Sequence, residues 1–106
     1  MGKREDIIKQ IKKFAKNAGG NIKIDKIIFF GSRASGKPHK DSDIDLIIVS
    51  NSFKGMNFFE RVAKMYNYWD LDYAVDFLCY TPEEFNELKK RISIVKEALS
   101  AGIFIS

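Results

Sequence analysis

Apolar residues change their spacing along the chain, and these changes divide it into helices and strands. Between residues 3 and 18, and again between 57 and 70, apolar positions recur three and four residues apart, which predicts two amphipathic helices. Apolar runs at 26–30, 46–49 and 73–80 are typical of buried strands. The pattern therefore predicts an α/β (α+β) fold, with a small mixed three-stranded sheet flanked by about four to five helices.

Two further helices are expected after the third strand. Thr81 is suited to cap the first of them, and Pro82 fits its first position because no backbone N–H is lost there. A final helix is expected over 92–101, with Gly102 at its end. The tail Ile103–Ile105 is short and apolar, and it is assigned no element.

Composition narrows the class of protein. The 106 residues are expected to form one domain, 1–106, with 45% hydrophobic and 30% charged residues, as in ordinary globular proteins. The net charge of +4 is mild and its basic residues are spread out, so no direct nucleic-acid binding is expected. No apolar run approaches membrane-spanning length, so no membrane association is expected. The single cysteine, Cys79, favours a reduced thiol and a cytoplasmic location.

A Gly-Ser pair follows directly on the first apolar strand. Gly31 permits a sharp turn and a close approach of its backbone to another group. Residues 32–35 are expected to form a short helix whose first amides point outward and can bind an anion. This turn is interpreted either as a cradle for a triphosphate, with Ser32 and Arg33 as further ligands, or as a simple strand-to-helix turn capped by serine. Arg33 is also explained as a solvated loop cation.

Two aspartates open the second strand. Asp43 and Asp45 are two residues apart and so point to the same side of a strand, where they repel each other unless a cation lies between them. A hard divalent cation such as magnesium takes oxygen ligands. Asp41 has the same parity and is a further candidate ligand.

A third carboxylate, Asp76, stands within the last apolar strand. An unpaired charge there is costly, so Asp76 is expected to have either a basic partner at the sheet end or a role in the site. Asp72 is the alternative if the register of that strand differs.

Taken together, Gly31-Ser32-Arg33, then Asp43-Ile44-Asp45-Leu46, and Asp76 on a later strand resemble the signature of the minimal nucleotidyltransferases, small members of the DNA polymerase β-like superfamily. The resemblance implies the nucleotidyltransferase fold. It implies that Asp43, Asp45 and Asp76 are catalytic and bind two Mg²⁺ ions, with ATP as the substrate. It also implies that the nucleoside triphosphate is bound by Gly31, Ser32 and Arg33.

The resemblance further implies an acceptor on another protein. Minimal nucleotidyltransferases are similar to antitoxins that pair with HEPN-type ribonucleases, and some adenylylate a tyrosine of that partner. The expected function is transfer of AMP to a hydroxyl of such a partner, since no segment for holding an acceptor is evident. The aromatic residues of 57–70, or the tail Ile103–Ile105, are expected to supply contacts.

Two other functions stay open. One is a noncatalytic antitoxin-like binding module that masks its partner. The other is a transferase for a small molecule or an RNA end, which the mild charge and the lack of an acceptor domain disfavour. The presence of the Gly-Ser turn together with all three carboxylates favours catalysis over both. The sequence gives no contact that would select the nucleotide base or name the acceptor.

Overall fold

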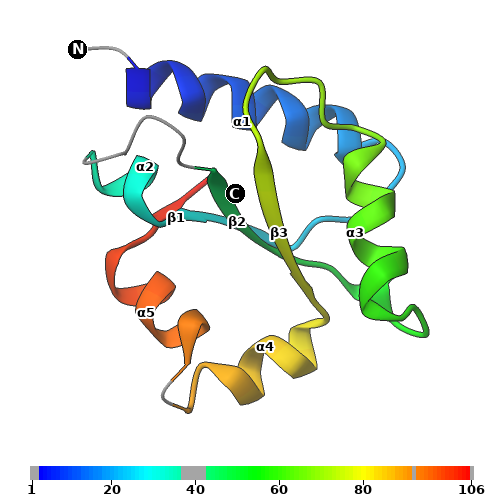
Figure 1. Cartoon of the computed structure of the whole chain (residues 1–106). Helices are drawn as coiled ribbons and strands as arrows, with labels where there is room; N and C mark the ends of the chain where they lie inside the picture. The colour runs from blue at the N-terminus through cyan, green and yellow to red at the C-terminus, as the bar shows by residue number, and fades with distance from the viewer. Residues whose placement is uncertain (1–2, 37–42, 92, 106) are drawn as a thin grey trace.

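The computed structural model describes residues 3–36, 43–91 and 93–105. Four strands form one mixed sheet in the order β3-β2-β1-β4 (Figure 1). β1 (Lys26–Phe30) pairs antiparallel with β2 (Ile44–Val49), which pairs parallel with β3 (Val75–Tyr80). β4 (Ile103–Phe104) pairs antiparallel with the other side of β1. The expected mixed sheet is present, but the expected number of three strands is wrong because the tail adds a fourth.

The fourth strand depends on how closely the chain approaches β1. A Cβ atom at Gly102 would collide with the carbonyl oxygen of Ala98 and with the side chain of Ile28. Glycine therefore lets α5 end directly against the sheet. The backbone N–H of Ile105 then donates a hydrogen bond to the carbonyl of Ile27 at 2.8 Å. A two-residue strand has no periodicity of its own, so its pairing could not be read from the tail sequence.

The described part of the chain contains five α-helices and one short 3₁₀ turn, η1. Their bounds are α1 (Lys3–Gly19), α2 (Ser32–Ser35), η1 (Asn51–Phe53), α3 (Phe58–Tyr66), α4 (Pro82–Leu88) and α5 (Ile94–Ala101). The helix α3 is shorter than the expected 57–70. Within the described ranges, none of the helices is long and apolar enough to cross a membrane.

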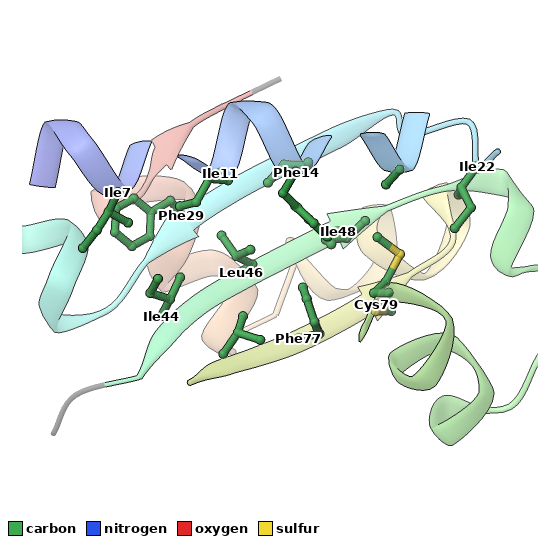
Figure 2. Close-up of a cluster of buried hydrophobic side chains, with 14 of the residues drawn as sticks. Ile7, Ile11, Phe14, Ile22, Phe29, Ile44, Leu46, Ile48, Phe77 and Cys79 are labelled. Carbon is green, nitrogen blue, oxygen red and sulfur yellow. The ribbon is translucent and has the colours of Figure 1, made fainter. Parts of the chain in front are cut away.

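The sheet has an apolar core on each face. One core lies under α1 and α3, where Phe14 and Phe29 are buried beside the alternate β2 residues Leu46 and Ile48 (Figure 2). The aromatic rings of Phe14 and Phe77 stack with their centroids 5.8 Å apart. The other core lies under α4 and α5. Its buried members are Ile28, Ile47, Val49, Phe85, Val95 and Ala98. Alternation along each strand therefore assigns every strand residue to one of these two faces.

Candidate active site

Three residues on adjacent strands form a row across one end of the sheet. Phe30 of β1 pairs with Asp45 of β2, and Asp45 pairs with Asp76 of β3. Asp45 has the parity of Ile47, which is buried under α4 and α5, so it projects from the α4–α5 face. Asp76 has the parity of Leu78, which packs against the same core. The register thus brings the second and third predicted carboxylates to the same face of neighbouring strands.

The turn after β1 is built around Gly31. Its φ is 84° and its ψ is −168°, a conformation that residues with a side chain rarely adopt. A Cβ atom at this position would also collide with the carboxylate of Asp45. The expected sharp turn is confirmed, and the group that approaches the glycine backbone in this structure is Asp45. The turn and the carboxylate are therefore fixed relative to each other.

The helix α2 starts at Ser32, directly after this turn, as expected. Its N-cap residue is Gly31, which has no side chain to cap the helix. The hydroxyl of Ser35 donates to the carbonyl of Ser32 at 2.9 Å, and Gly36 closes the helix in the left-handed conformation. The guanidinium of Arg4 donates to the carbonyl of Ala34 at 3.2 Å, which ties α2 to α1. The start of α2 thus has no capping side chain at its N-cap residue.

Arg33 lies on α2 and is engaged within the protein. Its guanidinium carbon is 4.9 Å from the centre of the Tyr73 ring, a cation–π contact. This contact links the turn to the segment that leads into β3. The structure therefore gives Arg33 a structural contact, and its expected contact with a phosphate stays a prediction.

The electrostatics of the row centre on Asp45. Its side chain is partly buried, and loss of hydration raises the pKa of its carboxyl above the ordinary value of 3.8. The charges of Asp76 and then Asp43 raise that pKa further. Asp45 is therefore repelled by the charges of Asp76 and Asp43, and a bound cation would relieve this repulsion.

Asp43 and Asp76 are both exposed to solvent. The expectation that Asp76 is a costly buried charge is wrong, because Asp76 lies near the start of β3, where its side chain on the α4–α5 side of the sheet is exposed. What links Asp76 to the site is its pairing with Asp45. Asp72 is also exposed, ahead of β3, and Asp41 lies outside the described residues.

The carboxylates suit a divalent cation in chemistry but do not form a closed ligand shell. Within the described ranges no three histidine, cysteine, aspartate or glutamate side chains are arranged to hold a metal ion. The side chains of Asp43, Asp45 and Asp76 offer carboxylate oxygens, the kind of ligand that Mg²⁺ takes. Because Asp43 and Asp76 are exposed, both side chains can turn toward Asp45 without disturbing the core. The residues therefore fit an ion that is partly liganded by water or by substrate phosphates.

A cavity of about 370 Å³ adjoins the turn on the same face of the sheet. One wall is formed by the turn and α2, and the other by α5. The lining residues are Phe30, Gly31, Ser32, Ser35, Ile94, Glu97, Ala98 and Ala101. The sequence reasoning missed the α5 wall, because an amphipathic helix gives no signal of which exposed residue borders a cavity.

A family model described as "Nucleotidyltransferase domain" matches residues 8–101. The chain belongs to this family. The matched range includes the Gly-Ser turn and the three aspartates that carried the resemblance. The predicted resemblance to a minimal nucleotidyltransferase domain of the polymerase β-like superfamily is confirmed.

Two curated relatives share part of the sequence. The chain is 35% identical over 68 residues to "Probable protein adenylyltransferase MntA" of Haemophilus influenzae, a match that covers 62% of this chain and 60% of the relative. It is 29% identical over 72 residues to "Putative protein adenylyltransferase MJ0141" of Methanocaldococcus jannaschii, which covers 66% of this chain and 73% of that protein. The chain thus spans less than two thirds of the length of the Haemophilus relative.

A solved structure shares the fold. It is described as a "putative nucleotidyltransferase" from Sulfolobus solfataricus, and it aligns with a TM-score of 0.68 over 98% of this chain and 89% of that one. The sequence identity is 22%, so this likeness concerns the fold alone.

Proposed function

We propose that this nucleotidyltransferase-family protein transfers AMP from ATP to a hydroxyl group of a partner protein, and that it needs Mg²⁺ to do so. One observation carries the proposal. The carboxylate of Asp45 lies between the Gly31 turn and Asp76 of the neighbouring strand. A glycine turn that opens a helix beside a row of carboxylates can hold a triphosphate and its cations together.

The turn binds the phosphates in this proposal. The amides that open α2 donate hydrogen bonds to phosphate oxygens, and the Ser32 hydroxyl adds one more donor. Gly31 is required because a side chain there would displace Asp45. Arg33 contributes positive charge close to the phosphates while its guanidinium stacks on Tyr73.

The three aspartates hold the cations. Asp43, Asp45 and Asp76 would bind two Mg²⁺ ions, which when bound would neutralise the triphosphate and lower the pKa of the attacking hydroxyl. Asp76 is exposed and can accept the proton of the attacking hydroxyl while the hydroxyl oxygen forms a bond to the α-phosphorus. The bond between the α-phosphorus and the bridging oxygen breaks, and pyrophosphate leaves.

The acceptor in this proposal is a protein, and a HEPN-type partner of a toxin–antitoxin pair is the one we favour. Two relatives named as protein adenylyltransferases support a protein acceptor. The exposed aromatic side chains of α3 support a protein contact, since Phe58, Phe59 and Tyr66 are 48%, 83% and 48% exposed. Such a pair would work in the cytoplasm, where ATP and magnesium are present and the buried thiol of Cys79 stays reduced.

The same aromatic surface favours one alternative, a noncatalytic module that binds and masks its partner. The two functions differ in a single measurement. The partner is co-purified with the protein, incubated with Mg-ATP, and measured by intact mass spectrometry. We expect the partner to gain the mass of one adenylyl group.

The matched control is the same complex carrying Asp45→Asn, together with wild-type complex in excess chelator. Both should leave the partner mass unchanged. A partner whose mass stays unchanged with the wild-type protein, while a free small molecule or RNA end is modified, would refute the protein-directed function.

A further inference from the structure

The solvent-facing side of α1 carries a row of lysines. Lys9, Lys12, Lys13 and Lys16 are all exposed, and their spacings of three and four residues place them within an arc of about 100° on one side of the helix. Together they form a lysine stripe that is roughly 10 Å long along the helix axis. The apolar side of α1 is buried against the sheet (Figure 1), so the lysine stripe faces away from the protein.

The charge of the lysine stripe is not neutralised within the part of the chain that the structure describes. None of the three ion pairs found there includes a residue of α1. Asp6 lies close to one turn before Lys9, but its carboxylate accepts a hydrogen bond from the side chain of Gln10 at 2.7 Å. Four positive charges therefore share one exposed surface without a carboxylate from the described residues paired to them.

The helix dipole explains only the end of this pattern. Positive side chains stabilise the last turn of a helix, and the effect falls off beyond that turn. Lys16 is the basic residue in the last turn of α1. Lys9, Lys12 and Lys13 lie in earlier turns, so the helix dipole does not account for them.

The surroundings of the lysine stripe decide which kind of polyanion fits it. The large exposed apolar side chains of the described residues lie on α3, α5 and β4, and none of them lies on α1. A protein interface needs apolar anchors, and a helix bound to a membrane needs an exposed apolar face. Single-stranded nucleic acid is held largely by stacking on aromatic rings. A nucleic-acid duplex, in contrast, can be bound through its phosphates by lysine side chains alone.

We propose that the lysine stripe binds the phosphate backbone of double-stranded DNA. Its length of roughly 10 Å is close to the width of about 12 Å of the major groove of B-form DNA, so its lysines can reach phosphates on both sides of that groove. The major groove of an RNA duplex is narrow, which fits the stripe less well. Contacts from lysine to phosphate carry no information about the bases, so the binding is independent of sequence.

The net charge of +4 does not reveal this surface, and no nucleic-acid binding was expected from it. The basic residues are spread out along the sequence, but the period of α1 gathers four of them on one side. The carboxylates and the cavity lie on the α4–α5 face of the sheet, whereas α1 covers the other face. The lysine stripe is therefore a separate site, and its binding of DNA does not depend on the proposed nucleotidyl transfer.

The salt dependence of DNA binding tests this site. The full chain is titrated into a fluorescently labelled DNA duplex of about 20 base pairs, and the anisotropy gives the affinity. The logarithm of the binding constant falls by about 0.9 per phosphate contact for each tenfold rise in salt, so four contacts predict about a hundredfold loss of affinity between about 50 and 200 mM KCl. Two duplexes of unrelated sequence should bind equally well.

Matched variants locate the contact. Lys12→Gln combined with Lys13→Gln removes two of the four charges, so the affinity should be weaker than that of wild type and should fall only about tenfold over the same range of salt. Arginine at both positions keeps the charge and should restore the hundredfold loss, to about the wild-type extent. Lys89→Gln combined with Lys90→Gln makes the same change of charge at exposed positions just after α4 and should match wild type. Thermal unfolding of each variant checks that it is folded.

Two kinds of result would overturn the proposal. If the glutamine variant of Lys12 and Lys13 keeps the affinity and salt dependence of wild type, or if wild type does not bind the duplex at about 50 mM KCl, the lysine stripe is only a solvated helix surface. If an RNA duplex or single-stranded DNA binds more tightly than the DNA duplex, the assignment to double-stranded DNA is wrong. Nucleotidyl transfer takes no part in these measurements, so either result leaves the proposed function unaffected.

Discussion

Asp45 is the residue at which charge and burial conflict most. It is partly buried and shares its surroundings with Asp76 and Asp43, which raises the pKa of its carboxyl. Because that pKa is above the ordinary value of 3.8, the folded protein holds the proton more tightly than the unfolded chain does. The protonated carboxyl therefore contributes to the stability of the folded protein. This contribution is fully present below pH 3.8 and is lost as the pH rises through the raised pKa.

The first prediction follows from this sign. In metal-free buffer at neutral pH, Asp45→Asn should raise the free energy of unfolding, by no more than about 1 kcal/mol because water screens a partly exposed site. The gain should vanish as the pH falls below 3.8. Urea denaturation across pH measures it. In the same variant, transfer from Mg-ATP should be abolished, because the proposed Mg²⁺ ions lose a carboxylate ligand. A variant that is less stable than wild type at neutral pH would show that the carboxylate is held by favourable contacts instead.

The second prediction concerns the contact between Gly31 and Asp45. Gly31→Ala should lower the free energy of unfolding by about 1–3 kcal/mol, because the backbone conformation is strained for alanine and the new methyl group collides with the carboxylate. In an Asp45→Ala background the collision is gone and part of this loss should disappear. The coupling should reach about 0.5 kcal/mol or more in a double-mutant cycle.

Gly55 provides the matched control for that cycle. Its φ is 79°, yet a Cβ atom there would meet nothing within 4 Å. Gly55→Ala should therefore show strain but no coupling to Asp45→Ala. Equal, additive losses at Gly31 and Gly55 would mean that the contact with Asp45 has no energetic weight.

At the scale of elements, helix starts could be predicted better than helix ends. Asn57 caps α3 through a reciprocal pair of hydrogen bonds with Glu60, and local sequence carries this signal. The end of α3 at Tyr66 is set by tertiary contacts. The Tyr66 hydroxyl donates to the carbonyl of Val75, and the Trp69 indole donates to the carbonyl of Tyr73. Such bonds from side chains to backbone carbonyls leave no mark on periodicity.

The face of α3 that was expected to be buried was also predicted only in part. Met65 is fully buried, as expected, while Phe58 and Tyr66 are about half exposed. Periodicity identifies an apolar stripe but not how much of it the sheet can cover. The Gly31 turn could likewise be predicted from local sequence, whereas Asp76 was linked to Asp43 and Asp45 only through the family resemblance. The wall that α5 adds around Glu97 could not, since it depends on the pairing of β4 with β1.

The third prediction concerns the ion pair that joins α3 to α4. Arg61 is largely buried, and its guanidinium bonds the Glu84 carboxylate at 2.6 Å and the carbonyls of Met56 and Cys79. Arg61→Met should lower the free energy of unfolding by about 2–3 kcal/mol, because these groups lose their donor. Glu84→Gln keeps an acceptor for the Thr81 cap and should cost about 1 kcal/mol.

The pH dependence of this pair checks the assignment. The hydrogen bond from Arg61 is the main cause that lowers the pKa of the Glu84 carboxyl below its ordinary value of 4.5. The stabilisation is therefore present above pH 4.5 and is lost as the pH falls through the lowered pKa. In urea denaturation, the gap between wild type and Glu84→Gln should close at low pH. A gap that persists unchanged there would contradict an ionic contribution.

At the scale of the molecule, the two faces of the sheet have different tasks. Figure 1 shows α1 and α3 on one face of the sheet and α4 and α5 on the other. The α1–α3 face holds the larger apolar core, whereas the α4–α5 face carries the carboxylates and the cavity at one end. The tail belongs to the fold, since Ile103 and Ile105 pack against the larger core. A partner that binds the folded protein is therefore expected to contact α3 in preference to the tail.

The fourth prediction tests that contact. Phe59 is 83% exposed on α3, and its ring is nearly perpendicular to that of Phe58 in a T-shaped contact, with the centroids 6.2 Å apart. Phe59→Glu should weaken the proposed partner complex at least about tenfold, since it places a charge in an apolar contact, and it should change the free energy of unfolding by no more than about 0.5 kcal/mol. Asn21→Glu, an exposed loop position, makes the same change of charge and should leave the complex intact. Binding measured by calorimetry with the purified partner decides between them. Nucleotide binding should be unaffected in either variant, because the turn and cavity lie on the opposite face of the sheet from α3. If the partner binds both variants with equal affinity, the partner does not bind at α3.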